Sequence, residues 1–158
     1  MKITLNIPPP KGTAQQQKTV ARGRFITKYD PPNVKEMKRI FTSELIPHAP
    51  EEPLEGALSL EVLFAYPYRK ADVKKAQGRE LWKNTSPDCD NLVKGLNDIM
   101  EKLGFYSNDG QIASLSIEKV WSAEPRIEIN LEEMEPYVEY GKCESFYINM
   151  KKSLQRIK

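Results

Sequence analysis

The segment 90–103 restricts the possible folds most strongly, because its spacing fits an amphipathic helix. Its apolar side chains recur every three or four positions and form one stripe, made of Leu92, Val93, Leu96, Ile99, Met100 and Leu103. Gly104 follows as a typical helix stop signal. A helix with a single apolar stripe packs that stripe against another apolar layer, so strands are expected around it.

Strand patterns occur on both sides of this helix. Apolar and polar residues alternate in four segments, residues 2–7, 56–66, 112–121 and 126–131, and residues 24–29 are a further short strand. A second helix is predicted to begin at Pro31-Pro32 and to continue to Leu45, and a helical turn at residues 72–77. The polar segment 11–24 is predicted to be a mobile loop. This order predicts an α/β (α+β) single domain with one mixed β-sheet flanked by helices.

The bulk properties point to a cytoplasmic, single-domain protein. The chain has 158 residues, of which 39% are hydrophobic, enough for one packed core. No segment approaches the roughly 18 apolar residues of a membrane span, and the N-terminal segment lacks the apolar region of a secretion signal. The chain has two cysteines, Cys89 and Cys143, so neither a disulfide framework nor a zinc finger is expected. No organic cofactor is expected either.

The basic residues are concentrated in two segments, although the net charge is only +2. Residues 1–39 hold nine basic and two acidic side chains, a local charge of +7, and residues 68–83 hold six and two, a local charge of +4. Such segments suit a polyanion such as nucleic acid. A solvated surface without a partner explains the charge equally well.

The candidate chemistry lies in residues 88–109. Asp88 and Asp90 are two positions apart in the approach to the helix, and Lys94 follows one helical turn after Asp90 on the same face. Asp109 directly precedes the next strand. If the topology brings these groups together, three carboxylates would hold Mg²⁺ or Mn²⁺ and Lys94 would stabilise negative charge on a phosphate.

Simpler interpretations of the same residues remain open at this level. Asp90 is a good helix N-cap, Asp88 favours the positive end of the helix, and Asn108-Asp109-Gly110 is a turn sequence. The Asp-x-Asp pattern also occurs in metal-dependent glycosyltransferases, which usually need a larger nucleotide-binding domain than this chain offers.

A longer pattern identifies a family. The order Asp88-Cys89-Asp90-Asn91-Leu92-x-Lys94, then Asp98, then Gly104-Phe105-Tyr106, then Asp109-x-Gln111, resembles the motif region of the RusA family of Holliday junction resolvases. The order and the spacing match over residues 88–119. The chain departs from the family in two places, because Asn108 replaces an acidic residue and residues 84–87 replace an arginine-rich run.

The resemblance implies a metal-dependent endonuclease that resolves four-way (Holliday) or other branched DNA junctions by paired symmetric phosphodiester cleavage. It places the metal ligands at Asp88, Asp90 and Asp109 and the essential lysine at Lys94. It also implies a homodimer with one site per subunit, a role in DNA recombination and repair, and an origin in a phage or prophage. A junction-binding protein that does not cut is the alternative.

The resemblance further divides the chain into a RusA-like domain at residues 1–135 and an extension of unknown role at residues 136–158. Segment 68–83 looks like an insertion relative to the family. The expected phosphate contacts combine both basic segments and comprise Lys18, Arg22, Arg24, Arg69, Lys70, Lys74, Lys75, Arg79 and Lys83.

Overall fold

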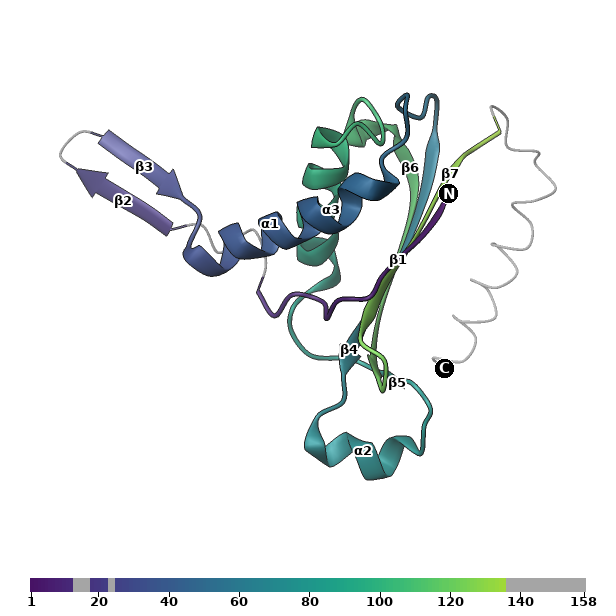
Figure 1. The fold of residues 1–158 in the computed structure, drawn as a ribbon. Helices are drawn as coiled ribbons and strands as arrows, with labels where there is room; N and C mark the ends of the chain where they lie inside the picture. Colours follow the sequence, from purple (N-terminus) through teal and green to yellow (C-terminus); the bar gives the residue numbers. More distant parts are fainter. Residues whose placement is uncertain (13–17, 23–24, 136–158) are drawn as a thin grey trace, which may run out of the picture.

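The computed structural model describes residues 1–12, 18–22 and 25–135 and has a mixed five-stranded sheet at its centre (Figure 1). The strand order is β1-β7-β4-β6-β5. These strands are β1 (Lys2–Leu5), β4 (Leu58–Pro67), β5 (Leu81–Trp82), β6 (Ile112–Ser122) and β7 (Arg126–Glu133). The pair β4 and β6 is parallel and the other pairs are antiparallel, which confirms the predicted mixed sheet.

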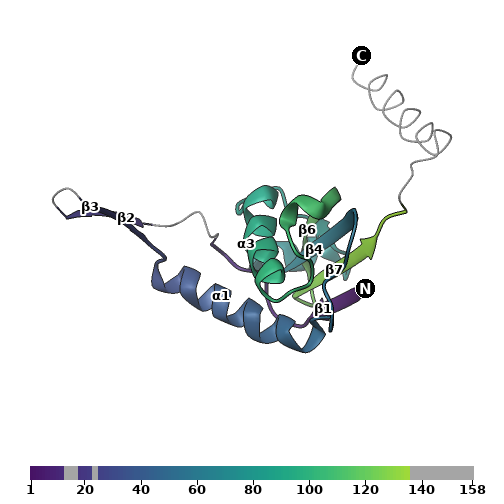
Figure 2. The same ribbon diagram turned by 90° about the horizontal axis from the view of Figure 1, so that it is seen from above.

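Two long helices cover one face of this sheet (Figures 1 and 2). They are α1 (Pro32–Leu45) and α3 (Cys89–Lys102), each close to its predicted bounds. On β4, alternate side chains are buried toward the helices: Leu58, Leu60, Val62, Phe64 and Tyr66. The apolar stripe of α3 packs on them, with Leu96 and Met100 fully buried. Burying each such side chain contributes about 1.5–3 kcal/mol, so these contacts fix α3 against the sheet.

The segment expected to be a loop before residue 24 contains a strand instead. The strands β2 (Lys18–Arg22) and β3 (Phe25–Tyr29) pair as an antiparallel two-stranded sheet, with Lys18 opposite Tyr29. This hairpin projects from the body of the molecule beyond the start of α1 (Figure 2). The loop prediction for this part was wrong, because strand pairing within a hairpin does not require the apolar alternation of a half-buried strand.

The segment between β4 and β5 forms the lower end of the molecule in Figure 1. It contains α2 (Lys70–Ala76), where a helical turn was predicted. Two short 3-10 turns, η2 (Ile46–His48) and η3 (Asp109–Gln111), complete the described elements. Over the described residues, no helix is long and apolar enough to cross a membrane.

Candidate active site

Two carboxylates of the sequence motif lie at the start of α3. Asp88 is the N-cap residue, and its backbone carbonyl accepts a hydrogen bond from Leu92 N at 3.1 Å. Its carboxylate makes no capping hydrogen bond to the helix. Asp90 lies in the first turn rather than at the cap, and both aspartates are exposed. The partial positive charge of the helix start stabilises both carboxylates, and their oxygens remain available to a ligand.

Lys94 lies on the outer side of the same helix. It is exposed one turn beyond Asp90, whereas Leu92 and Leu96 on the opposite side are buried in the core. Asp98, one further turn along, is half-buried. Because the opposite side of α3 is buried, Asp90 and Lys94 both face solvent, as the sequence spacing predicts.

Asp109 is also exposed, at the start of η3. The turn is capped by its neighbours: Asn108 Oδ1 accepts from Gly110 N at 2.8 Å, and Gln111 Oε1 accepts from Asn108 N at 3.1 Å. Gln111 Nε2 also donates to Leu54 O at 3.0 Å, which fixes the turn beside the start of β4. The turn is therefore stabilised without the carboxylate of Asp109.

Two buried tyrosines mark the ends of the molecule at which these acids lie. Burial, followed by the charge of Cys89, raises the pKa of Tyr66, which lies at the end of β4. Burial, followed by the charges of Glu101, Asp109 and Asp98, raises the pKa of Tyr106. The residues around Asp88 are therefore close to Tyr66, and Asp109 is close to Tyr106.

These two ends are separated by most of the length of β6. The Lys119 ammonium donates to Pro87 O, next to Asp88, whereas Asp109 precedes the first residue of β6. At about 3.3 Å per residue, the strand from Ile112 to Lys119 separates the two ends by about 20 Å. Among the described residues, no three acidic, histidine or cysteine side chains lie close enough to hold one metal ion. One copy of the chain therefore does not assemble the expected set of three carboxylates.

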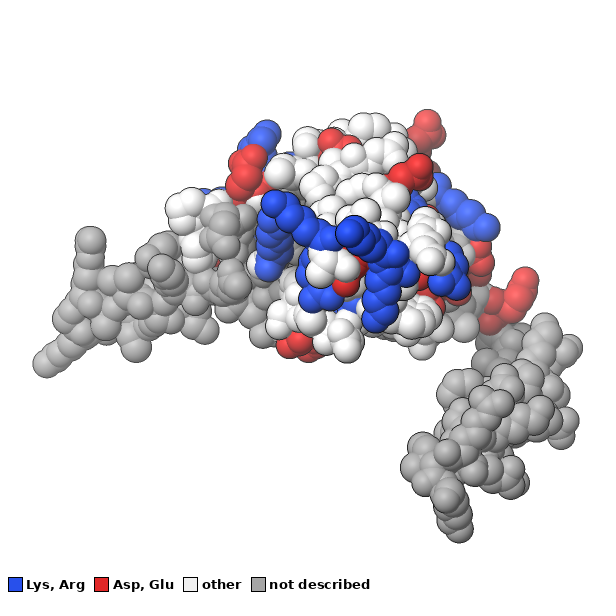
Figure 3. All heavy atoms as spheres, turned by 90° about the horizontal axis from the view of Figure 1, so that it is seen from below, with Lys and Arg blue, Asp and Glu red and all other residues white. Residues whose placement is uncertain are grey.

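The predicted phosphate contacts fall into two groups. Lys70, Lys74, Lys75 and Arg79 are exposed on α2 and the turn after it. Figure 3 looks at this end of the molecule and shows the Lys and Arg side chains gathered on it. Lys18 and Arg22 belong to β2, and Arg24 lies outside the described residues.

Two basic residues near α2 are already engaged within the chain. Arg69 pairs with Asp72, with Nε 2.6 Å from Oδ2, which lowers the pKa of that carboxyl group. Lys83 differs most from the prediction, because its side chain is buried and only 6% exposed. The sequence did not single out Lys119. The ammonium groups of Lys83 and Lys119 both bind backbone carbonyls, so neither is free to contact a phosphate.

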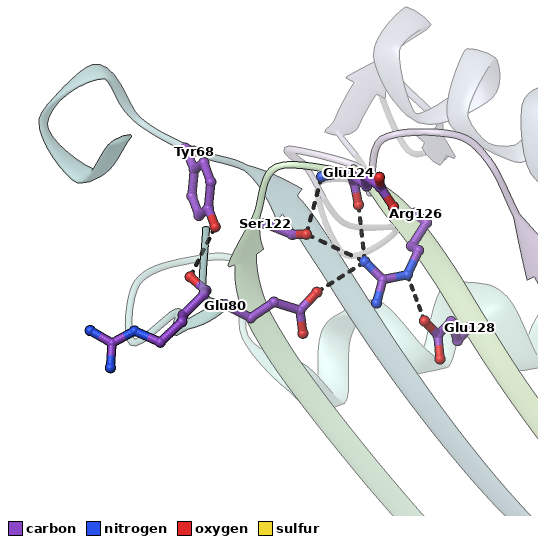
Figure 4. A network of polar contacts seen from close by, with 7 residues as sticks. Tyr68, Glu80, Ser122, Glu124, Arg126 and Glu128 are labelled. Atoms are coloured by element: carbon purple, nitrogen blue, oxygen red, sulfur yellow. Dashed lines mark hydrogen bonds and ion pairs between the residues drawn. The ribbon is translucent and has the colours of Figure 1, made fainter. Parts of the chain in front are cut away.

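An arginine network holds the segment after α2 against the sheet (Figure 4). Arg126 of β7 pairs with Glu80, with Nη1 3.0 Å from Oε1, and with Glu128, with Nε 2.5 Å from Oε1. On the same segment, Tyr68 Oη donates to Arg79 O at 2.9 Å. These contacts give the basic end of the molecule a defined position relative to the sheet.

The fold and these side chains define a class of protein. It is an α+β domain in which two carboxylates and a lysine are exposed at the start of one helix, and a basic surface lies beyond the same end of the sheet. A family model described as endodeoxyribonuclease RusA matches residues 8–132. The chain belongs to the RusA family of endodeoxyribonucleases.

Two relatives agree with this family membership. The chain is 36% identical over 92 residues to the crossover junction endodeoxyribonuclease rusA of Lactococcus phage r1t, covering 58% of this chain and 68% of that protein. It is 30% identical over 131 residues to the uncharacterized protein YqaN of Bacillus subtilis (strain 168), covering 79% of this chain and 87% of that protein.

Proposed function

We propose that this protein is a metal-dependent endonuclease that resolves four-way DNA junctions by paired cuts. The observation that carries the proposal is the start of α3, where Asp88, Asp90 and Lys94 are exposed together in a chain of the RusA family. Neither carboxylate is used to cap the helix or to form an ion pair among the described residues. The phage relative is named a crossover junction endodeoxyribonuclease, which supports the junction as the substrate.

The donor atoms at this helix start fit a divalent metal ion. Asp88 and Asp90 supply carboxylate oxygens, the ligands that Mg²⁺ and Mn²⁺ prefer. When bound, such an ion supplies a Lewis acid that lowers the pKa of a water and offsets charge on the phosphate. Lys94, one turn away, contributes a fixed positive charge toward the same phosphate. Asp109 is the third ligand, and in this proposal it comes from a second copy of the chain.

A homodimer formed through β6 would complete the set. Among the described residues, 112–118 of β6 pair with β4 on one side and with no strand on the other, and β5 pairs with β6 at Val120 and Trp121. An open strand edge of this kind is a template for a second strand. Leu115, at the middle of that edge, is 47% exposed, although it is a large apolar side chain.

Antiparallel pairing of two β6 edges about Leu115 matches the sequence of the strand. The twofold axis would place Leu115 against its own copy, Ser114 opposite Ser116, and Ile112 opposite Glu118, so no like charges face each other. Because the partner strand runs in the opposite direction, Asp109 of one copy would lie beside the Asp88 end of the other. Each dimer then has two sites, as paired cuts in two strands require.

The basic end of the molecule supports DNA binding near these sites. The exposed Lys70, Lys74, Lys75 and Arg79 follow β4 at the end of the sheet where α3 begins. Together with Lys18 and Arg22 of the projecting hairpin, they would contact phosphates on the arms of a junction. Contacts from lysine and arginine side chains to phosphates carry no base-sequence information, so binding by shape and charge is expected from this surface.

The test is a cleavage assay on a synthetic four-way junction beside a linear duplex, with Mg²⁺, with Mn²⁺ or with EDTA. Paired symmetric nicks in the junction alone, abolished by EDTA, are expected from the wild type. Asp90→Asn is expected to abolish cutting and to retain junction binding. Junction binding without nicks in either metal would instead identify a binding protein that does not cut.

A further inference from the structure

The segment between β5 and α3 is held by a buried lysine. Lys83 Nζ lies 2.9 Å from Thr85 O and 2.8 Å from Thr85 Oγ1, and it also donates to Ser86 O. An ammonium group has three N–H donors, so these acceptors use all of them. Lys83 therefore has no donor left for a DNA phosphate.

A second lysine contacts the same segment from the neighbouring strand. Lys119 Nζ of β6 lies 3.0 Å from Thr85 O and also donates to Pro87 O. Backbone pairing joins the two lysines, because Lys83 N donates to Lys119 O at 2.9 Å. Together the two ammonium groups bind the backbone carbonyls of residues 85, 86 and 87, which directly precede Asp88.

The surroundings of Lys83 strengthen these contacts. Its ammonium lies 4.9 Å from the centre of the Tyr66 ring and 4.7 Å from that of Trp121, so aromatic rings replace water around the charge. Hydrogen bonds from a charged donor are roughly twice as strong as neutral ones. Burial, followed by the nearby charges of Lys119 and Arg69, lowers the pKa of Lys83. Burying a charged lysine costs free energy, and the hydrogen bonds to Thr85 and Ser86 offset that cost.

We infer that Lys83, assisted by Lys119, is a positioning residue that holds Asp88 and the start of α3 in the geometry that binds the metal ion. The inference rests on the proposed function for the identity of the ligand. Residues 84–87 form neither helix nor strand. Among the described residues, the hydrogen bonds that hold the backbone carbonyls of residues 85–87 come from these two lysines. Lys83 acts through the position of the carboxylates and does not touch the DNA.

The variant Lys83→Met removes the charge and keeps a long side chain. Without the ammonium, Ser86 O and Thr85 Oγ1 lose their donor and Thr85 O keeps only its hydrogen bond from Lys119, so the segment before Asp88 gains freedom. The two carboxylates then spend less time in the geometry that binds one ion. Metal affinity is expected to fall at least about tenfold, while junction affinity without metal stays at the wild-type level.

The experiment uses the full chain in three measurements. Mn²⁺ binding to the protein alone is titrated by electron paramagnetic resonance, hydrogen exchange is followed in peptides spanning residues 84–91, and junction binding is measured in EDTA. Lys83→Met is expected to weaken Mn²⁺ binding and to speed exchange in that peptide. Lys83→Arg, which keeps the charge, is expected to recover part of both. Lys119→Met is a second test with a less buried side chain and is expected to show the same pattern.

Lys75→Ala is the matched control, because Lys75 is an exposed cation of the same basic segment. It is expected to weaken junction binding and to leave Mn²⁺ binding unchanged. The inference is overturned if Lys83→Met binds Mn²⁺ as the wild type does or leaves exchange in residues 84–91 unchanged. If the wild type itself binds no Mn²⁺, the proposed function fails together with the inference. If the wild type binds Mn²⁺ and Lys83→Met binds it equally well, the inference alone fails.

Discussion

Mixing two inactive variants tests whether the active site is shared between copies. In one variant, Asp90→Asn removes a carboxylate at the start of α3, and in the other, Asp109→Asn removes the carboxylate before β6. These residues lie about 20 Å apart in one copy, so a shared site takes them from different copies. In a mixed dimer, both substitutions then fall in one site, and the other site keeps all three carboxylates.

The expected recovery follows from counting sites. Random assembly of equal amounts makes about half of the dimers mixed, and each mixed dimer has one complete site of two. About one quarter of all sites are therefore restored. A single complete site nicks one strand only, so a supercoiled plasmid with an extruded four-way junction is expected to become a nicked circle. The wild type, with two complete sites, is expected to make the linear form.

The control is a mixture of Asp88→Asn with Asp90→Asn. Both substitutions lie in the same half of the site, so every site in that mixture lacks a carboxylate and no nicking is expected. Each variant alone is also expected to be inactive. If the Asp90→Asn and Asp109→Asn mixture, assembled from co-expressed chains, nicks no better than this control, the shared site is refuted.

Three further outcomes are expected. Leu115→Asp places two carboxylates on the proposed twofold axis, so light scattering is expected to show a monomer that does not cut; a stable dimer would exclude the β6 interface. Replacing Lys74 and Lys75 together by Ala is expected to lower the slope of log binding constant against log salt by roughly 2, and an unchanged slope would remove them from the DNA surface. The folded-state pKa of Tyr106 is raised, so its contribution to stability is present below about pH 10 and is lost as the pH rises through the folded-state value. Urea unfolding is therefore expected to show a steeper alkaline loss in the wild type than in Tyr106→Phe, and equal slopes would contradict the shift.

Periodicity predicted the parts of the fold that bury a regular face. The helix α3 and the strands β4, β6 and β7 were confirmed to within a few residues. On α3, β4 and β7, burial against one core imposes the pattern, whereas β6 is exposed or half-buried from Ile112 to Lys119. The two-residue strand β5 is too short to show a period, and the sequence of β2, Lys-Thr-Val-Ala-Arg, has no regular alternation of apolar and polar residues. Neither strand left a signal in the sequence.

The candidate site was predictable in its local half only. The spacing of Asp88, Asp90 and Lys94 fixes their relation on a single helix, and the structure presents them as expected. The distance of Asp109 depends on the direction of β6 beside β4, which residue spacing does not encode. Lys83 was grouped with the DNA contacts, because a buried and an exposed lysine look alike in a basic sequence.

The separation of the acids along β6 also bears on how such a nuclease is controlled. In the proposed dimer, a newly made copy carries two incomplete sets of ligands and is harmless to the DNA around it. Cutting begins only when the chain concentration approaches the dissociation constant of the dimer, and below that value the amount of active enzyme rises with the square of the concentration. The length of a single strand would thus make the onset of DNA cleavage depend on the level of expression.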